Sequence, residues 1–567
     1  MNTETRICQN CKSDFNIEPE DLNFYEKIHV PAPTFCPSCR LQRRLVWMKG
    51  LQLFKRKCDL CGEMKFSMYE PDAPYTVYCS RCWWSDKWNP MHYSMDYDSS
   101  RTFLEQWNEL LHKVPLLGLS VDKETGETSP FTNHVGKSKN CYLIYYSEHN
   151  EDCMYGYYLK ESKNILNCSP IMNSENCYDC GNTFKCFNLV GSRNVRHDLD
   201  SYFLYDCDNC TNCFGSVNLR SKSYVFFNEQ LTKEEYFDKL KEIDLGSYKN
   251  YVHWKSKALE HKKKYPPKPN YDDFSTNSTG SYCFESRNCK ECYEVLGAED
   301  SKYLMLIKQG KVKESYDYTD WGYNAENLYE CMTVGEDVQR VKFTHESGFG
   351  TFDTEYSKLI TGGSYIFGCV GLNKASHCIL NKQYSKEEYD ALRKQIIEDM
   401  NKNPYKSNCG HEYKYGEFFP PEFSPHPYND TFASRFFPMK KEEIIKCGLE
   451  WHEPEQKEYA VTISSQDLPD NIKDVNESIL NEVIGCEKCK RGFRVVVNEL
   501  NFLKKHNLPL SRNCPFCRIW DKIDLWVKNM HQYDRTCNKC GVEFKTHYTK
   551  ERAPIIYCKD CYKKEVL

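Results

Sequence analysis

The chain has 567 residues, enough for several domains, and a formal net charge of −5, which excludes a uniformly basic protein that coats nucleic acid. No stretch approaches the roughly 20 apolar residues that span a bilayer, and no signal peptide is visible at the N-terminus. With 33 cysteines and no export signal, we expect a cytoplasmic protein whose thiols are reduced or bound to metal.

The N-terminal segment contains two four-cysteine units, each built from two Cys-x-x-Cys pairs, with a long spacer in the first unit (12–35) and a shorter one in the second (62–78). Four thiolates on two tight turns form a tetrahedral zinc site without an open coordination position, so each unit is predicted to be a structural zinc ribbon. The longer spacer predicts a long hairpin or a short helix. The predicted ligands are Cys8, Cys11, Cys36 and Cys39 in ribbon 1 (1–50), and Cys58, Cys61, Cys79 and Cys82 in ribbon 2 (51–95).

A basic connector joins these two ribbons: residues 40–57 carry seven positive charges and no acidic residue, together with Trp47 and Phe54. Cations mixed with stackable aromatic rings suit a ligand with phosphates and bases, so RNA, single-stranded DNA or a ribonucleoprotein is the first predicted partner. The alternative is a solvated connector that offsets the negative charge of two thiolate-rich sites. The predicted nucleic-acid contacts are Arg40, Arg43, Arg44, Lys55, Arg56 and Lys57.

A helical connector is predicted over 96–135. Apolar residues recur at helical spacing between Phe103 and Val114, behind Ser99 and Ser100 as possible caps, and so predict a helix over 100–114. We expect this helix to pack the ribbons onto the segment that follows.

Short repeats rich in Asn and Cys begin at position 138, and the next copies begin at positions 150, 162 and 174. This short, fixed period predicts a stacked solenoid, a parallel β-helix with Asn at left-handed turns and Cys stacked inside the coils. The repeats form block I (136–245) and block II (281–400), with a linker at 246–280. For Cys207, Cys210 and Cys213 the alternative is an iron–sulfur cluster, because their spacing overlaps that of ferredoxins.

Each block ends in a capping box, Thr232 to Glu235 and Ser385 to Glu388, followed by an amphipathic helix. We expect each helix to cover the last coil, whose strand edge would otherwise be unpaired. Residues 401–480 are rich in Pro and predicted to be irregular, with one short helix after Pro438.

The C-terminal segment repeats the long and the short cysteine spacer at the same lengths, and Asn501-Phe502 matches Asn23-Phe24 at the same distance from the cysteines. This internal duplication predicts ribbon 3 (481–530) and ribbon 4 (531–567), and hence four zinc ions per chain. Cations of ribbon 3 are expected to assist nucleic-acid contact: Lys490, Arg491, Arg494, Lys504 and Lys505. The predicted ligands are Cys486, Cys489, Cys514, Cys517, Cys537, Cys540, Cys558 and Cys561.

The succession of ribbons, basic connector and Asn-Cys repeats, with the closing segment 381–389, resembles an uncharacterised zinc-ribbon family found in uncultivated, small-genome bacteria. The resemblance covers nearly the whole chain. It implies the same architecture for this protein, and it implies no activity, because the family has none established.

The predicted fold class is mainly β: a Cys-rich β-solenoid in two blocks with helical caps, flanked by tandem four-cysteine zinc ribbons at both ends. No nucleotide-binding or hydrolase signature occurs in the sequence. We therefore expect a zinc-dependent, non-enzymatic binding or scaffold protein that contacts nucleic acid and no membrane. One alternative is a protein-only scaffold in which the ribbons act as folding clamps and the solenoid faces a partner. Another is a glycan-active β-helix enzyme that uses Asp198, Asp200 and Asp206.

Overall fold

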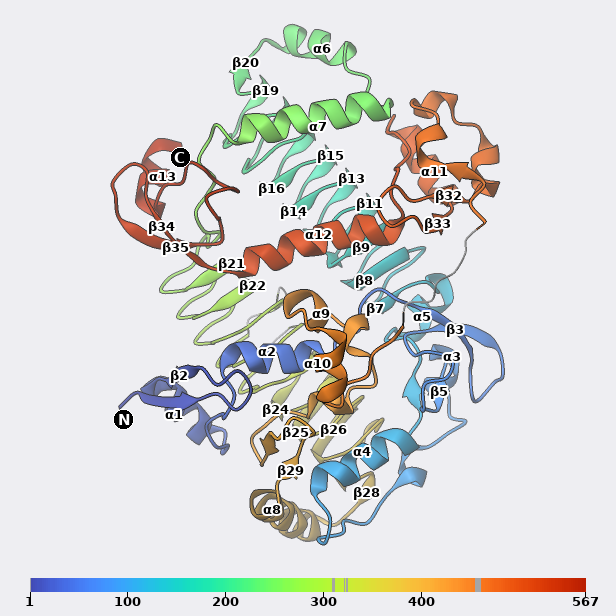
Figure 1. Ribbon diagram of the computed structural model, residues 1–567, viewed down its shortest axis with the longest axis vertical. Helices are drawn as coiled ribbons and strands as arrows, with labels where there is room; N and C mark the ends of the chain where they lie inside the picture. The colour runs from blue at the N-terminus through green and yellow to red at the C-terminus, as the bar shows by residue number, and fades with distance from the viewer. Residues whose placement is uncertain are drawn as a thin grey trace. The chain divides into compact units, whose positions relative to one another are not determined.

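The computed structural model describes residues 2–307, 310, 312–320, 322, 325–453 and 460–566. The remaining residues, some of them in the predicted block II and in the Pro-rich segment, lie outside the described residues. The chain divides into two compact units: Met1–Gly118 with Asn270–Glu453 (unit 1), and Leu119–Pro269 with Pro454–Leu567 (unit 2). Unit 1 thus joins ribbons 1 and 2 to block II, whereas unit 2 joins block I to ribbons 3 and 4 (Figure 1). Among the described residues of both units, none of the helices combines enough length and apolar character to cross a bilayer.

The solenoid of unit 2 is a stack of coils whose parallel strands repeat at a constant spacing, since Leu159 pairs with Ile171 and Ile165 with Cys177. The two solenoids have about 20 turns in all. The strands of unit 2 are β7 (Asn133–Gly136), β8 (Tyr142–Glu148), β9 (Met154–Tyr157), β10 (Leu159–Lys160), β11 (Lys163–Leu166), β12 (Ile171–Met172), β13 (Glu175–Tyr178), β14 (Gly181–Phe184), β15 (Phe187–Val190), β16 (Arg193–Arg196), β17 (Leu199–Tyr202), β18 (Thr211–Phe214) and β19 (Ser223–Phe226).

Each coil turns at every third residue, where the backbone is left-handed: φ is 53° at Asp152, 57° at Tyr155 and 61° at Tyr158. Paired positions such as Leu159 and Ile171 are 12 residues apart, so one coil contains four such corners and has four short sides. Asn adopts this conformation more easily than other non-glycine residues, because its short polar side chain can bond locally. As predicted, Asn occupies many of the corners, among them Asn164, Asn167, Asn173, Asn176, Asn182, Asn188 and Asn194.

The interior of the coils is narrow and is filled by Cys, Ser and aliphatic side chains. Small polar side chains also join one coil to the next: the backbone N–H of Cys180 donates to Cys168 Sγ (3.3 Å), and that of Leu204 to Ser192 Oγ (3.0 Å). All fifteen cysteines from Cys141 to Cys378 are free and buried, which confirms the prediction of stacked thiols. Cys409 and Cys447 depart from the expected reduced state, because they form a disulfide.

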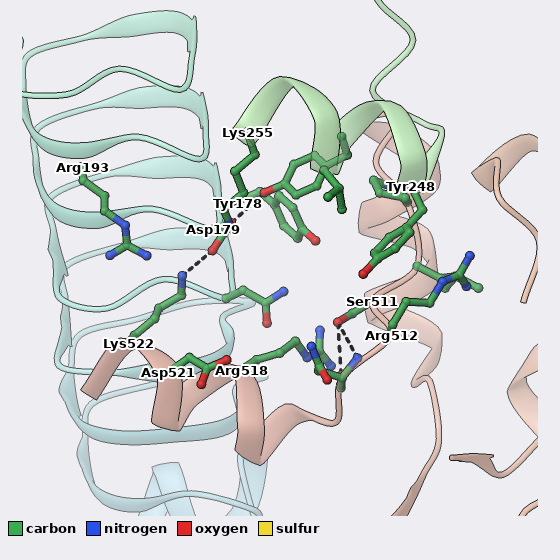
Figure 2. A pocket seen from close by; sticks show the side chains of 16 residues that line it. Tyr178, Asp179, Arg193, Tyr248, Lys255, Ser511, Arg512, Arg518, Asp521 and Lys522 are labelled. Atoms are coloured by element: carbon green, nitrogen blue, oxygen red, sulfur yellow. Dashed lines mark hydrogen bonds and ion pairs between the residues drawn. The ribbon is translucent and has the colours of Figure 1, made fainter. Parts of the chain in front are cut away.

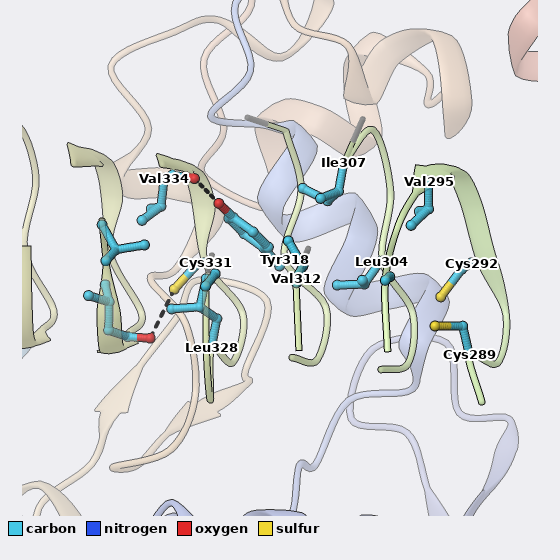
Figure 3. Close-up of a cluster of buried hydrophobic side chains, with 14 of the residues drawn as sticks. Cys289, Cys292, Val295, Leu304, Ile307, Val312, Tyr318, Leu328, Cys331 and Val334 are labelled. Carbon is cyan, nitrogen blue, oxygen red and sulfur yellow. Dashed lines mark hydrogen bonds between the residues drawn. The ribbon is translucent and has the colours of Figure 1, made fainter. Parts of the chain in front are cut away.

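The solenoid of unit 1 follows the same plan with coils of unequal length. Gly280 pairs with Cys292, Met332 with His345, and Lys302 with Tyr316, so the spacing between paired positions changes from coil to coil. Cysteines and aliphatic side chains again point into the coils, as the cluster around Cys331 shows (Figure 3). The strands are β21 (Gly280–Phe284), β22 (Cys292–Leu296), β23 (Met332–Gly335), β24 (Gln339–Lys342), β25 (His345–Glu355), β26 (Thr361–Phe367) and β27 (Ser376–Ile379).

The last coil of each block is closed by a short antiparallel strand and then a helix. β20 (Glu229–Gln230) pairs with β19 and leads to α6 (Lys233–Lys241), and β28 (Lys382–Gln383) pairs with β27 and leads to α8 (Lys386–Lys402). Both predicted capping boxes form. The predicted linker at 246–280 contains α7 (Tyr248–Lys262), whose Tyr251 and Ala258 are buried.

All four ribbons place the first Cys-x-x-Cys pair in a hairpin turn and the second at the start of a helix. In ribbons 1 and 3 the long spacer contains a helix, α1 (Pro19–Lys27) or α11 (Val497–Lys505), which confirms the short helix, one of the two alternatives predicted for this spacer. Unit 1 contributes β1 (Glu4–Ile7), β2 (Asp14–Ile17), α1 (Pro19–Lys27), α2 (Pro37–Leu45), β3 (Phe54–Lys57), β4 (Met64–Ser67), β5 (Val77–Tyr78) and α3 (Ser80–Trp83). Unit 2 contributes β32 (Ile484–Gly485), β33 (Gly492–Phe493), α11 (Val497–Lys505), α12 (Pro515–Met530), β34 (Tyr533–Thr536), β35 (Glu543–Thr546) and α13 (Lys559–Val566).

The helix predicted over 100–114 is α4 (Phe103–Lys113), and its cap is Thr102 rather than Ser99 or Ser100. Its Trp107 stacks on Phe419 at 3.9 Å, next to the fully buried Trp47, and so forms a core with the irregular segment 401–453. That segment contains α10 (Lys441–Lys446), the short helix predicted after Pro438. The predicted fold class, a Cys-rich β-solenoid with four-cysteine ribbons near both termini, is confirmed.

Candidate metal centres and the basic helix faces

The structure brings the sixteen predicted cysteine ligands together in four groups, one per ribbon. Each group combines a pair from a hairpin turn with a pair at a helix start, and its sulfur atoms lie within 4.8 Å of one another. The groups are Cys8, Cys11, Cys36 and Cys39; Cys58, Cys61, Cys79 and Cys82; Cys486, Cys489, Cys514 and Cys517; and Cys537, Cys540, Cys558 and Cys561.

The geometry of these groups fits a tetrahedral metal ion. Four thiolates about 2.3 Å from one zinc ion would be separated by about 3.8 Å. The Sγ atoms of Cys11 and Cys36 are 3.7 Å apart, and so are those of Cys489 and Cys514. Backbone donors stabilise the thiolates as well, because in each ribbon the N–H of the third cysteine donates to the Sγ of the first, at 3.2 or 3.3 Å. Each group can therefore hold a metal ion with four protein ligands.

The prediction that Arg40, Arg43 and Arg44 contact nucleic acid is wrong, because all three are buried on α2, with exposures of 1%, 3% and 1%. They face carboxylates of unit 1. Arg40 Nε donates to Asp317 (2.9 Å), and Arg44 Nη1 lies 3.2 Å from the same carboxylate. Arg43 bridges two acids, Glu330 and Glu417. Three buried cations thus meet three buried carboxylates, which leaves none of these charges for a phosphate.

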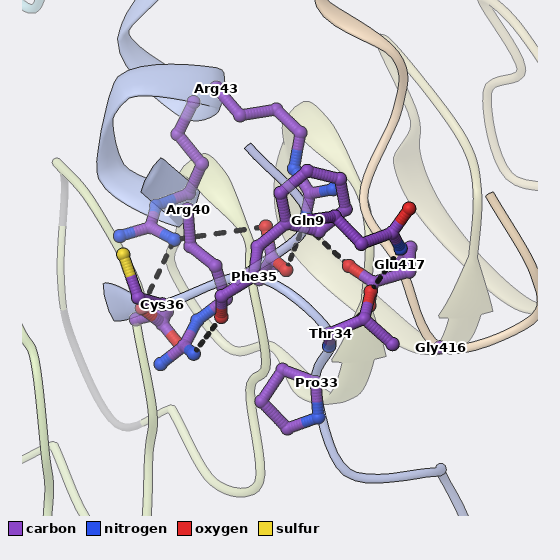
Figure 4. A network of polar contacts seen from close by, with 12 residues as sticks. Gln9, Pro33, Thr34, Phe35, Cys36, Arg40, Arg43, Gly416 and Glu417 are labelled. Carbon is purple, nitrogen blue, oxygen red and sulfur yellow. Dashed lines mark hydrogen bonds and ion pairs between the residues drawn. The ribbon is translucent and has the colours of Figure 1, made fainter. Parts of the chain in front are cut away.

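Glu417 connects this ion network to Thr34, which lies just before the start of α2 (Figure 4). One of its oxygens accepts from Arg43 (2.8 Å), and the other accepts from the backbone N–H of Thr34 (2.8 Å). The Arg43 guanidinium also lies over the Phe35 ring, 4.3 Å from its centroid. Burial raises the pKa of Glu330 to about 7. The network fixes ribbon 1 against the solenoid of unit 1.

The other cations of the connector divide into buried and exposed residues. Arg56 is buried and donates to the carbonyl oxygens of Glu70 (2.9 Å) and Tyr75 (3.2 Å), so it too is unavailable to a phosphate. Lys55 and Lys57 are exposed. Of the six predicted nucleic-acid contacts, these two alone have the required exposure. The cations of ribbon 3 that were expected to assist, Lys490, Arg491, Arg494, Lys504 and Lys505, are all exposed.

Unit 2 repeats this attachment of a ribbon helix to a solenoid. Arg518, which follows the ribbon cysteines as Arg40 does, donates to Glu499 (2.8 Å) and lies 4.3 Å from the ring centroid of Tyr155. The Tyr155 hydroxyl donates to the other oxygen of Glu499 (2.7 Å). One turn further along α12, Lys522 pairs with Asp179 of the solenoid. In both units, basic side chains on the helix of a long ribbon thus bind the solenoid of the same unit.

The acidic residues considered for glycan chemistry do not gather in an open cleft. Asp198 and Asp206 are buried, and Asp200 accepts a hydrogen bond from Asn188 (2.7 Å). Asp198 points into the coil, where it accepts from the backbone N–H of Cys210 (2.7 Å), and burial raises its pKa to about 8.

The cysteines considered for an iron–sulfur cluster also lie inside the coils. Cys207 Sγ donates to the carbonyl oxygen of Ser216 (3.7 Å), and Cys213 Sγ to that of Lys222 (3.6 Å). Within the described residues, neither thiol belongs to a group that can hold a metal. The solenoid interpretation therefore accounts for these residues.

A cluster that the sequence did not indicate joins Glu70, Asp430 and His452 in unit 1. The three side chains could surround a cation, but a cation is already present: Lys49 Nζ lies 3.1 Å from Asp430. The same Asp430 oxygen is 3.0 Å from His452 Nδ1. We interpret the cluster as a buried ion-pair network.

Comparison with protein-family models, curated proteins and solved structures finds no match to this chain. The resemblance to the uncharacterised zinc-ribbon family therefore stays a prediction.

Proposed function

We propose that this protein is a non-enzymatic scaffold stabilised by four zinc ions, in which the ribbons clamp the solenoids and the solenoid body binds a protein partner. The observation that carries this proposal is that the basic side chains of the ribbon helices α2 and α12 form ion pairs within their own units. Arg40, Arg43 and Arg44 are paired with carboxylates of unit 1, as Arg518 and Lys522 are with Glu499 and Asp179 of unit 2.

Zinc suits this role because a ribbon of about 40 residues buries too little apolar surface to fold alone. Metal binding then supplies the folding free energy, on the order of 10–16 kcal/mol per structural site in small zinc domains. With four protein ligands, such a site has no position for a substrate, which favours a structural over a catalytic role.

The clamp is tested by replacing Cys8 and Cys39 with Ser and measuring amide hydrogen exchange across the full chain. If ribbon 1 is a clamp, protection is lost in α2 and also in the facing coils near Asp317 and Glu330. The matched control replaces Cys177 and Cys180, which are buried thiols of unit 2 outside any ribbon. Unchanged protection of the unit 1 coils in the ribbon variant would contradict the proposal.

A nucleic-acid partner is the second candidate, and the exposed cations of ribbon 3 favour it. In that case RNA affinity falls with salt, with a slope of about −0.7 in log affinity on log salt per phosphate contacted. Replacing Arg491 and Arg494 by Glu would weaken binding, whereas replacing Arg43 would act only through folding. The absence of RNA binding at low salt would leave the protein scaffold as the function.

A further inference from the structure

A pocket of about 240 Å³ lies within unit 2, where α12 and the residues before it face α7 and the solenoid (Figure 2). Its lining is strongly cationic, with five basic side chains and two carboxylates, Asp179 and Asp521. We propose that this pocket binds a small phosphorylated molecule. The basic residues of the lining are Arg193, Lys255, Arg512, Arg518 and Lys522.

The two carboxylates of the lining are already engaged by other groups. Asp179 pairs with both Lys255 and Lys522, and it also accepts a hydrogen bond from the Tyr251 hydroxyl (2.7 Å). Asp521 pairs with Lys488 outside the pocket. The lining therefore provides no carboxylate for its three arginines.

Two of these arginines carry buried donors without a partner. The Arg518 side chain is only 9% exposed; its Nη1 bonds Glu499, but its Nε and Nη2 are buried and unbonded. Arg512 is 7% exposed and uses Nη2 on the carbonyls of Leu468 and Pro469, while its Nη1 has no partner. Buried donors are nearly always satisfied, and leaving a charged one unsatisfied is costly. Both guanidinium groups line the pocket, where an anion would offset their positive charge.

Arg193 adds a third guanidinium from the solenoid side. It lies on β16, and within the described part of the chain its side chain makes no hydrogen bond or ion pair, although its backbone N–H donates to the carbonyl oxygen of Leu204 (2.8 Å). The side chain occupies the space above Gly181, where a Cβ atom would lie 2.6 Å from Arg193 Nη1. Figure 2 shows Arg193 extending toward Asp179 and Lys522 along the wall of the solenoid.

The position in unit 1 that corresponds to Arg518 has an acceptor that Arg518 lacks. Arg40 is the counterpart of Arg518, and its Nε donates to the Asp317 carboxylate at 2.9 Å. In unit 2 the Arg518 Nε has no such acceptor, and Arg518 is one of the residues that line the pocket. An external oxyanion would take the place that a protein carboxylate fills in unit 1.

The chemistry of the lining favours phosphate over other anions. Guanidinium groups bind phosphate oxygens through paired N–H donors, and the two lysines share the single carboxylate of Asp179, which leaves one further positive charge. Tyr178, Tyr248 and Tyr251 supply ring surface for the rest of the molecule. Since ligand pockets of about 300–1,000 Å³ hold drug-sized molecules, a pocket of this volume suits a small metabolite.

The test is isothermal titration of the full, zinc-loaded chain with inorganic pyrophosphate, with citrate as the carboxylate probe. Arg193→Gln should weaken pyrophosphate binding about 10-fold or more, the loss expected for a hydrogen bond to a charged group. Arg193→Lys should lose less, because it keeps the charge. The matched control is Arg196→Gln, on the same strand but outside the pocket lining.

Equal pyrophosphate affinity in the wild type and Arg193→Gln would overturn the proposal, as would the absence of binding at millimolar pyrophosphate and low salt. Tighter binding of citrate, with the same dependence on Arg193, would overturn the assignment to phosphate. Because the Arg193 side chain makes no hydrogen bond or ion pair among the described residues, its replacement should leave the zinc content and the melting temperature unchanged.

Discussion

Arg43 is the residue whose replacement best separates a role in docking from a role in nucleic-acid binding. Its guanidinium bridges Glu330 and Glu417 while 3% exposed. Replacing Arg43 with Met keeps most of the stem and removes the charge. Two buried carboxylates then lose their shared cation, a change that typically costs about 3–5 kcal/mol. Since burial already raises the pKa of Glu330 to about 7, protonation of Glu330 limits the loss. We expect Arg43→Met to lower the stability by about 3 kcal/mol at neutral pH, by more at pH 9 and by less at pH 5.

The assay is hydrogen exchange in α2 and in the coils around Glu330, which reports the local free energy of opening. Combining Arg43→Met with Glu417→Gln should recover much of the loss, because two cations, Arg40 and Arg44, then face two carboxylates, Asp317 and Glu330. Lys57→Met is the matched control: an exposed cation of the same basic run, expected to change stability by less than about 0.5 kcal/mol. A loss below about 1 kcal/mol for Arg43→Met, or reduced RNA affinity at unchanged stability, would refute the docking role.

Three further predictions concern the solenoids. The pKa of Asp198, raised to about 8 by burial, exceeds that of an unfolded Asp, about 3.9, so the contribution of Asp198 to native stability is greatest below pH 4 and falls as pH rises toward 8. Asp198→Asn should remove this slope, up to about 1.4 kcal/mol per pH unit in urea unfolding; an unchanged slope would contradict the pKa shift. Cys177→Ala should cost about 1 kcal/mol through lost packing without changing the metal content, and a loss of metal would mean that a ligand was mistaken for core. Ser385→Ala should lower the stability by about 1 kcal/mol and reduce the protection of backbone amides from hydrogen exchange at the start of α8. Full protection there would exclude the capping role.

The local parts of the structure were predictable from the sequence. Cysteine spacing defined all four ribbons, because two Cys-x-x-Cys turns at a fixed distance suit few structures other than a metal site. The short period of the Asn-Cys repeats defined the solenoid, and the capping boxes located the starts of α6 and α8. The four-sided coil was not predicted, since left-handed corners also carry residues such as Tyr155 and His149, which give no pattern.

The parts that depend on distant contacts were not predictable. The basic run around Arg43 looked exposed because its acidic partners are far away in the sequence: Asp317 is 277 residues from Arg40, and Glu417 is 374 from Arg43. One signal was present in the duplication, since Asp21 and Glu499 occupy matching positions after a ribbon cysteine and both bind the solenoid of their unit. The helix α7 was missed because its lysine-rich sequence buries only Tyr251 and Ala258.

Metal analysis of the freshly purified chain tests most directly the claim that zinc-bound ribbons clamp the solenoids. The four cysteine groups predict about four zinc ions per chain, with Cys8, Cys11, Cys36 and Cys39 around one of them. Adding a chelator should release the zinc and unfold the ribbons together. Fewer than three bound ions per chain, or disulfides joining those cysteines, would contradict the proposed structural role of zinc.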